Sequence, residues 1–132
     1  MSKENVETIR RIYSEGLLER PEEFLALVAP EVEYVNPPEA VEPGVRRGVA
    51  DVAKAFANIS KSFDSSRYEL HGLFSADDAV VASVSFCARF RGGEGEVVQE
   101  EAHTWILCGG RITRFEWGRD LKAALETAGL SD

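Results

Sequence analysis

Residues 79–90 read AVVASVSFCARF, and residues 96–107 read EVVQEEAHTWIL. Both stretches are rich in β-branched and aromatic residues, which favour extended strands. The sequence GGEG between them, residues 92–95, is typical of a hairpin turn. A glycine pair at 109–110 leads into a further predicted strand over residues 111–117. We therefore predict an antiparallel meander in the C-terminal half of the chain.

The two faces of the strand 79–90 differ in polarity, because successive side chains of a strand point to opposite sides. One face is wholly apolar and consists of Val80, Ala82, Val84, Phe86, Ala88 and Phe90. The other face is mixed and consists of Val81, Ser83, Ser85, Cys87 and Arg89. A sheet of this kind packs helices on its apolar face and leaves the other face to solvent or to a second subunit.

Helical patterns precede the meander. Apolar residues recur at spacings of three and four residues in the stretches 3–18 and 48–63, which predicts an amphipathic helix in each. Pro21 suits the first turn of a short helix over residues 21–28. These helices provide the apolar surfaces that a sheet needs as a cover.

The remaining elements complete an α+β fold. Short strands are predicted over residues 31–36 and 67–74, with a loop between residue 36 and the helix that follows. Asp120 suits the N-cap of a final helix over residues 121–128. Helices come first and strands follow, an order typical of α+β proteins.

Composition narrows the classes of partner. The chain has 132 residues, which suits a single domain spanning residues 1–132. It carries 15 basic and 23 acidic residues, a net charge of −8. This acidic balance argues against binding to nucleic acid or to an anionic membrane. No apolar run approaches the roughly 20 residues that a membrane span needs.

Cysteine usage and the first residues indicate a reducing compartment. Cys87 and Cys108 stand alone, without the paired spacing of a zinc site, so no metal is expected. Residues 1–7 contain no apolar stretch of a signal peptide. We therefore expect a cytoplasmic protein with reduced thiols.

Several short motifs recur in one known superfamily. They are the first helix with Tyr13, the segments 33–38 and 46–52, Ala102-His103-Thr104-Trp105, the turn before Gly110-Arg111-Ile112 and the ending 120–126. In this order they resemble the SnoaL-like family of the nuclear-transport-factor-2-like superfamily, over residues 4–130. Each motif is weak alone, and only their order is specific for the fold.

The resemblance implies an α+β, cystatin-like cone. A curved antiparallel sheet would wrap around N-terminal helices, with a short C-terminal helix and a pocket between sheet and helices. Relatives include polyketide cyclases, ketosteroid isomerases, limonene-epoxide hydrolases, dehydratases and binding modules, and many form homodimers through the outer face of the sheet. A fold with so many activities does not specify one.

Tyr13 and His103 are the main candidates for chemistry. By position Tyr13 matches the tyrosine that stabilises an oxyanion in the ketosteroid isomerases. His103 shares a strand face with Trp105, and an imidazole can accept or donate a proton near neutral pH. The alternatives are a core tyrosine with a solvated hydroxyl and a structural histidine.

Tyr34 and Asn36 resemble the pair that positions water in limonene-epoxide hydrolases. Asn36 also stands where the isomerases carry a catalytic aspartate, and an amide cannot act as a general base. Asn before proline is also a common start of a turn. The hydrolase relay would fall at Val84, Phe86 and Trp117, which are all apolar, so that mechanism is disfavoured.

We expect a pocket wall of aromatic side chains, either as ligand contacts or as plain core. The candidates are Phe56, Phe86, Trp105, Phe115 and Trp117. Such a wall favours a hydrophobic ligand over a sugar or a phosphate.

Two acidic residues complete the candidates. The cyclases carry a catalytic aspartate near the end of the chain, for which Asp120 is the candidate here, although an N-cap is the favoured interpretation. Glu100 and Glu101 are adjacent, so they point to opposite faces of a strand. If Glu101 shares the face of His103, the two can form a carboxylate–imidazole pair. We favour the alternative, in which Glu101 lies at the solvated rim of the pocket.

The sequence thus predicts a SnoaL-like pocket protein that needs no cofactor. Its first predicted function is proton transfer on a small hydrophobic carbonyl compound, in isomerisation, cyclisation or dehydration. His103 would be the general acid or base and Tyr13 the oxyanion donor. The alternative is a non-catalytic module for small-molecule binding or dimerisation. Convergence of Tyr13 and His103 on one point would favour the enzyme.

Overall fold

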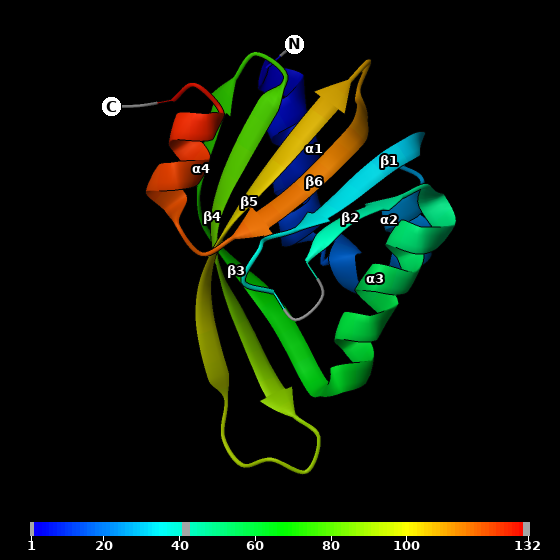
Figure 1. Ribbon diagram of the computed structural model, residues 1–132, viewed down its shortest axis with the longest axis vertical. Coiled ribbons are helices and arrows are strands. Elements are labelled where there is room, and N and C mark those ends of the chain that lie inside the picture. The colour runs from blue at the N-terminus through cyan, green and yellow to red at the C-terminus, as the bar shows by residue number, and fades with distance from the viewer. Residues whose placement is uncertain (1, 41–42, 131–132) are drawn as a thin grey trace.

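The computed structural model describes residues 2–40 and 43–130, which form five helices and six strands (Figure 1). The helices are α1 Ser2–Ser14, the 3-10 helix η1 Leu17–Glu19, α2 Pro21–Leu25, α3 Val49–Ser62 and α4 Leu121–Thr127. The strands are β1 Val28–Asn36, β2 Gly44–Arg47, β3 Phe63–Ala76, β4 Ala79–Phe90, β5 Val97–Cys108 and β6 Arg111–Gly118.

All six strands belong to one curved sheet, in the order β2-β1-β6-β5-β4-β3 (Figure 1). The run from β3 to β6 is the predicted antiparallel meander. β1 extends the sheet by pairing parallel with β6 and antiparallel with β2. Helices come first and a short helix ends the chain, so the predicted α+β class is confirmed.

Several boundaries differ from the sequence-based prediction, and in three places a strand replaces the expected helix or loop. The helix expected over residues 21–28 ends at Leu25, because the strand β1 begins at Val28, which pairs with Ile112. The loop expected before the third helix contains β2, whose four residues pair with β1. Phe63 begins β3 and pairs with Phe90, although its spacing assigned it to the preceding helix. In each case pairing with a distant strand overrides the local pattern.

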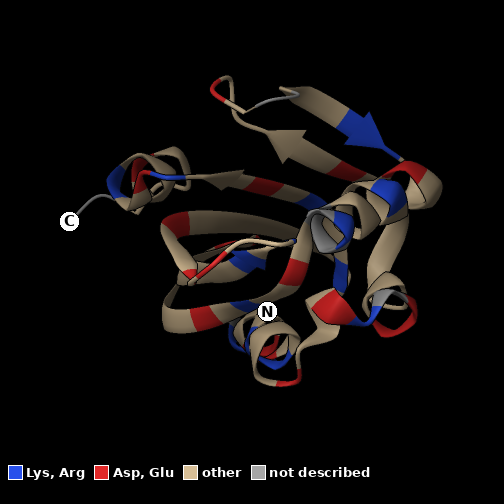
Figure 2. Cartoon of the chain, turned by 90° about the horizontal axis from the view of Figure 1, so that it is seen from below, with Lys and Arg blue, Asp and Glu red and all other residues tan. Residues whose placement is uncertain are grey.

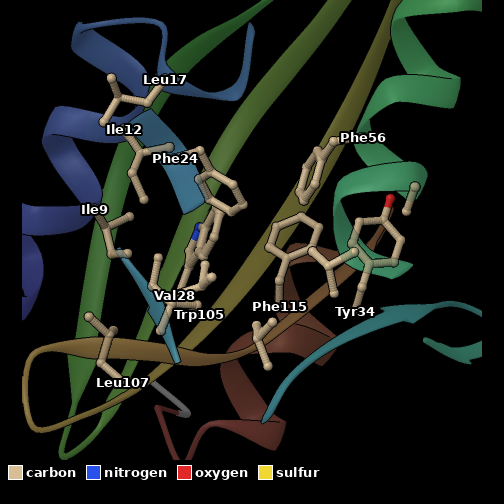
Figure 3. Close-up of a cluster of buried hydrophobic side chains, with 14 of the residues drawn as sticks. Ile9, Ile12, Leu17, Phe24, Val28, Tyr34, Phe56, Trp105, Leu107 and Phe115 are labelled. Atoms are coloured by element: carbon tan, nitrogen blue, oxygen red, sulfur yellow. The ribbon is translucent and has the colours of Figure 1, made fainter. Parts of the chain in front are cut away.

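The core lies between the helices and the inner face of the sheet. α1 packs against β3 and β4, and α3 packs against β1 and β3. Fully buried side chains fill this space: Ile9, Ile12, Val80, Trp105, Leu107 and Ile112. Figure 3 shows Ile9, Ile12, Trp105 and Leu107 within this cluster. The inward face of β4 is the apolar face that the sequence predicts. Burying a large apolar side chain contributes about 1.5–3 kcal/mol, so this cluster is a major source of stability.

The outer face of the sheet carries α4, which packs against β4 and β5 (Figure 1). Asp120 begins this helix, and its side chain accepts a hydrogen bond of 3.1 Å from the backbone N–H of Ala123. The predicted N-cap is therefore confirmed. Acidic and basic residues are interspersed over helices and strands (Figure 2). No described helix is long and apolar enough to cross a membrane.

Candidate functional site

A cavity of about 490 Å³ lies between the inner face of the sheet and α3. Small-molecule sites typically measure about 300–1,000 Å³. Aromatic rings from β1, β3, β4 and β6 form much of its wall: Tyr34, Phe63, Tyr68, Phe86, Phe90, Phe115 and Trp117. Polar side chains interrupt this wall: Asn36, Glu39, Arg46, Asn58, Gln99, Glu101, His103 and Arg119.

β5 supplies the polar centre of the cavity. Its alternate residues Gln99, Glu101, His103 and Trp105 share the inner face, because side chains of a strand repeat with a period of two. Glu101 pairs across the sheet with Val84 of the apolar face. A single strand therefore presents three polar groups side by side to a cavity with a largely aromatic wall.

Tyr13 of α1 meets His103 from behind the cavity. Its hydroxyl lies 2.6 Å from Nδ1 of His103, and the indole N–H of Trp105 donates to the same hydroxyl over 2.9 Å. An indole nitrogen can only donate, so the Tyr13 oxygen accepts there and its single proton goes to His103. Burial raises the pKa of Tyr13 well above 10, which keeps that proton on the phenol.

The second ring nitrogen of His103 is bound as well. Nε2 lies 2.8 Å from Oε1 of Glu101, and the amide of Gln99 donates to Oε2 over 2.6 Å. Since Nδ1 accepts from Tyr13, the proton of a neutral imidazole is on Nε2 and is donated to Glu101. The geometry thus defines a directed chain from Trp105 through Tyr13 and His103 to a carboxylate.

The position of Glu101 corrects the sequence-based expectation. Its side chain is 8 % exposed and that of His103 is 1 % exposed, so the carboxylate is not at a solvated rim. A buried carboxylate is stable only when donors compensate for lost water, and here His103 and Gln99 do so. Both His103 nitrogens are occupied, whereas each Glu101 oxygen accepts only one of these hydrogen bonds and Glu101 lines the cavity.

Tyr34, Asn36 and Trp117 form a second polar group on the cavity wall. The indole N–H of Trp117 donates to Oδ1 of Asn36 over 2.6 Å. Burial and the negative charge of Glu101 raise the pKa of Tyr34 to about 12, although Arg46 and Trp117 oppose this shift. Tyr34 is therefore a neutral phenol throughout the physiological range.

The structure brings most of the predicted site residues together and places three behind the wall. His103, Tyr34, Asn36, Phe86, Phe115 and Trp117 line the cavity. Tyr13, Phe56 and Trp105 instead support lining residues from the core side. The Phe56 ring lies 5.1 Å from that of Tyr34, and the Trp105 ring lies 4.4 Å from that of Phe115.

Asp120 lies outside the cavity. It caps α4 and borders a smaller hollow between that helix and the outer face of the sheet. Tyr13 and His103 do meet, at a shared hydrogen bond rather than at a point inside the cavity. Within residues 2–40 and 43–130, no three His, Cys, Asp or Glu side chains are grouped to hold a metal ion.

Sequence reasoning missed Tyr68 and Gln99. Gln99 follows from the period of β5, since it is two residues before Glu101 on the same face. Tyr68 lines the cavity from β3, with its ring 5.1 Å from that of His103 and 5.0 Å from that of Phe86. A shift in strand pairing puts it there, and alternation alone does not reveal that shift.

Solved structures with this fold come from several sources. A protein described as a SnoaL-like polyketide cyclase from Jannaschia sp. CCS1 is 17 % identical, with 100 % of this chain and 95 % of that one covered and a TM-score of 0.79. TerC, crystallised with polyporic acid, is 23 % identical, with coverage of 95 % and 97 % and a TM-score of 0.75. An LEH-like epoxide hydrolase of M. tuberculosis is 15 % identical, with coverage of 96 % and 90 % and a TM-score of 0.71. At these identities the likeness establishes the fold alone.

A family model gives the closer assignment. The model described as SnoaL-like domain matches residues 6–115, a segment that includes Tyr13, Tyr68, Glu101 and His103. None of the curated proteins compared matches the chain. The resemblance stated from the sequence is confirmed at the level of family and fold. The chain belongs to the SnoaL-like domain family.

Proposed function

We propose that this protein is a proton-transfer enzyme acting on a small hydrophobic carbonyl compound, in an isomerisation, an aldol-type cyclisation or a dehydration. The observation that carries the proposal is the Glu101 carboxylate, buried in an aromatic cavity and held by two donors. A positioned carboxylate of this kind is suited to general acid–base catalysis. Glu101 would be the general base of the reaction.

Glu101 takes the role of base that the sequence suggested for His103. The imidazole uses both nitrogens, for Tyr13 and for Glu101, and has no lone pair left for a substrate. Each carboxylate oxygen has lone pairs beyond those used by His103 and Gln99. We assign to His103 the positioning of the carboxylate and to Tyr13 the choice of the imidazole tautomer.

A ligand panel tests the proposal. Steroids, aromatic polyketides and small terpenoid ketones are incubated with the wild type and with Glu101→Gln. We expect a compound that raises the melting temperature of both proteins and is converted only by the wild type. Conversion by Glu101→Gln at the wild-type rate would contradict the proposal.

A binding module without chemistry is the second candidate. The observation that favours it is that Tyr13, His103 and Gln99 of the polar centre all bind protein groups. A compound that stabilises the protein and is recovered unchanged after long incubation would support this alternative.

We also propose a homodimer that works in the cytoplasm. Phe74 and Val98 lie on the outer face of the sheet and are 40 % and 55 % exposed, as expected for a face that a second subunit covers. Cys87 and Cys108 are both unpaired, which suits a reducing compartment. Sedimentation equilibrium tests the dimer, and Phe74→Lys with Val98→Lys should give a monomer.

A further inference from the structure

Tyr68 is a phenol in the cavity whose hydroxyl makes no hydrogen bond within residues 2–40 and 43–130. In the same ranges no fully buried side-chain nitrogen or oxygen lacks a partner. The Tyr68 hydroxyl is therefore accessible from the cavity, where a ligand or solvent can accept a hydrogen bond from it. Polar groups in such an apolar surrounding normally have a partner, so a bound molecule with an acceptor fits this position.

The surroundings of Tyr68 keep it protonated and close to the proposed base. Its ring stands edge-on to that of His103 at 5.1 Å and packs against Phe86 at 5.0 Å. Burial raises the pKa of Tyr68 well above 10, and the negative charge of Glu101 raises it further. The phenol is thus a hydrogen-bond donor within electrostatic range of the carboxylate.

Tyr13 cannot serve as this donor in the observed arrangement. Its proton goes to His103, its oxygen accepts from Trp105, and its side chain lies behind the cavity wall. A substrate oxygen would have to displace His103 to reach it. The role that the sequence suggested for Tyr13 therefore falls to another residue.

We propose that Tyr68 is the oxyanion donor and that the substrate is a carbonyl compound with an acidic hydrogen on the adjacent carbon. This inference rests on the proposed function. Glu101 takes the proton from that carbon, and the C–H electron pair becomes the C=C bond of an enolate. The carbonyl π pair moves to oxygen, which accepts the Tyr68 hydrogen bond. The carbonyl then reforms as Glu101 returns the proton to carbon. In a cyclisation, the enolate carbon instead attacks a second carbonyl of the same molecule, and Glu101 gives its proton to the alkoxide oxygen that results.

The test uses 4-nitrophenolate as a stand-in for the enolate, because both carry their charge on an oxygen attached to a planar carbon framework. Binding is measured at pH 8 in Glu101→Gln, whose neutral amide represents the protonated base. Adding Tyr68→Phe should weaken 4-nitrophenolate binding about 10- to 100-fold, the usual worth of a hydrogen bond to a charged group. Binding of neutral 4-nitrotoluene should change less than about threefold, since the ring packing is retained.

Tyr13→Phe in the same background is the matched comparison, because it removes the same hydroxyl from the other candidate. The proposal requires the larger loss of 4-nitrophenolate affinity in Tyr68→Phe. Equal affinity after Tyr68→Phe, a larger loss in Tyr13→Phe, or no binding of 4-nitrophenolate to Glu101→Gln would overturn it.

Failure of the proposed function gives a different result. Glu101→Gln would then leave catalysed hydrogen exchange of a ketone unchanged, whatever the phenolate titration shows. If both proposals hold, Tyr68→Phe alone lowers the exchange kcat about 100- to 1,000-fold with little change in KM. A purely structural role for Tyr68 would not separate 4-nitrophenolate from 4-nitrotoluene.

Discussion

Trp105 sets the direction of the hydrogen bonds that end at the cavity. Its indole has a donor and no acceptor, so it makes Tyr13 donate onward to His103, and His103 donate to Glu101. A fully buried residue without contact to the cavity thereby determines which oxygen lone pairs of Glu101 are left for a substrate. At the scale of single residues, the site depends on this order of donors and acceptors.

Removing the Tyr13 hydroxyl tests that order. Tyr13→Phe keeps the ring and leaves the buried Nδ1 of His103 without a donor, so we expect the free energy of unfolding to fall by about 1–3 kcal/mol. Urea denaturation measures the change. Thr8→Ala, which removes an exposed hydrogen bond from the same helix, should cost less than about 0.5 kcal/mol. Equal effects of the two substitutions would argue against the directed chain of hydrogen bonds from Trp105 to Glu101.

Tyr34 predicts how stability depends on alkaline pH. Its pKa is about 12 in the folded protein and near 10 when unfolded, so the unfolded state loses the phenol proton first. The stabilisation is complete below pH 10 and is lost as pH rises toward 12. At pH 11 the loss amounts to about 1 kcal/mol. Denaturation at pH 9 and pH 11 should show this extra loss in the wild type relative to Tyr34→Phe, and identical losses would contradict the assignment.

At the scale of elements, the pairing of β3 explains why strand alternation does not place Tyr68 in the cavity. From the turn at Asp77 and Asp78, regular pairing with β4 would place Tyr68 opposite Cys87, on the outer face. The pairing shifts by one residue between Leu70 and Gly72, so Tyr68 lies opposite Phe86 instead. Such a shift moves every following side chain to the other face. The local signal is Gly72, because an isolated glycine within a strand pattern suggests a bulge.

In the other elements too, some features follow from the local sequence and others depend on pairing with distant strands. The alternation in β4 and β5 is local, so the inner face with His103 and Glu101 could be predicted from the sequence. The burial of Glu101 could not, because its donor Gln99 and the surrounding wall are assembled by the sheet as a whole. β2 has only four residues and forms through its partner β1.

Asp120 provides a test of one element. Asp120→Ala removes the N-cap of α4, and we expect a loss of about 1 kcal/mol in the free energy of unfolding. Because Asp120 lies outside the cavity, the rate with any substrate found should stay within twofold of the wild type. A loss of activity with unchanged stability would instead support the catalytic role considered for this residue.

At the scale of the whole molecule, one fold combines a cavity of largely aromatic wall with an outer sheet face that carries the exposed apolar side chains Phe74 and Val98. Membership of the family implies this architecture, but it does not specify the activity, which depends on the residues of the site. The cavity wall comes from strands that are far apart in sequence. Ligand binding should therefore report on the cavity and stabilise the fold as a unit.

Substitution of two phenylalanines on opposite faces of the sheet tests whether a ligand binds in the cavity or elsewhere on the surface. A ligand at 100 times its Kd should stabilise the wild type by about 2.7 kcal/mol. Phe86→Ala removes a ring from the cavity wall and should weaken this stabilisation, measured by thermal denaturation at fixed ligand concentration. Phe74→Ala removes an exposed ring from the outer face and should leave it unchanged. The reverse pattern would place the ligand elsewhere.

Hydrogen exchange of a ketone tests the role of Glu101 most directly. The rate at which 2-tetralone exchanges the hydrogens beside its carbonyl group in D₂O is followed by NMR with the wild type, Glu101→Gln and Glu100→Gln. Glu100 is the neighbouring carboxylate on the outer face, so it controls for the change of charge. We predict catalysed exchange by the wild type and Glu100→Gln and a loss of about 100-fold or more in Glu101→Gln. Equal exchange by the wild type and Glu101→Gln would show that Glu101 is not the base.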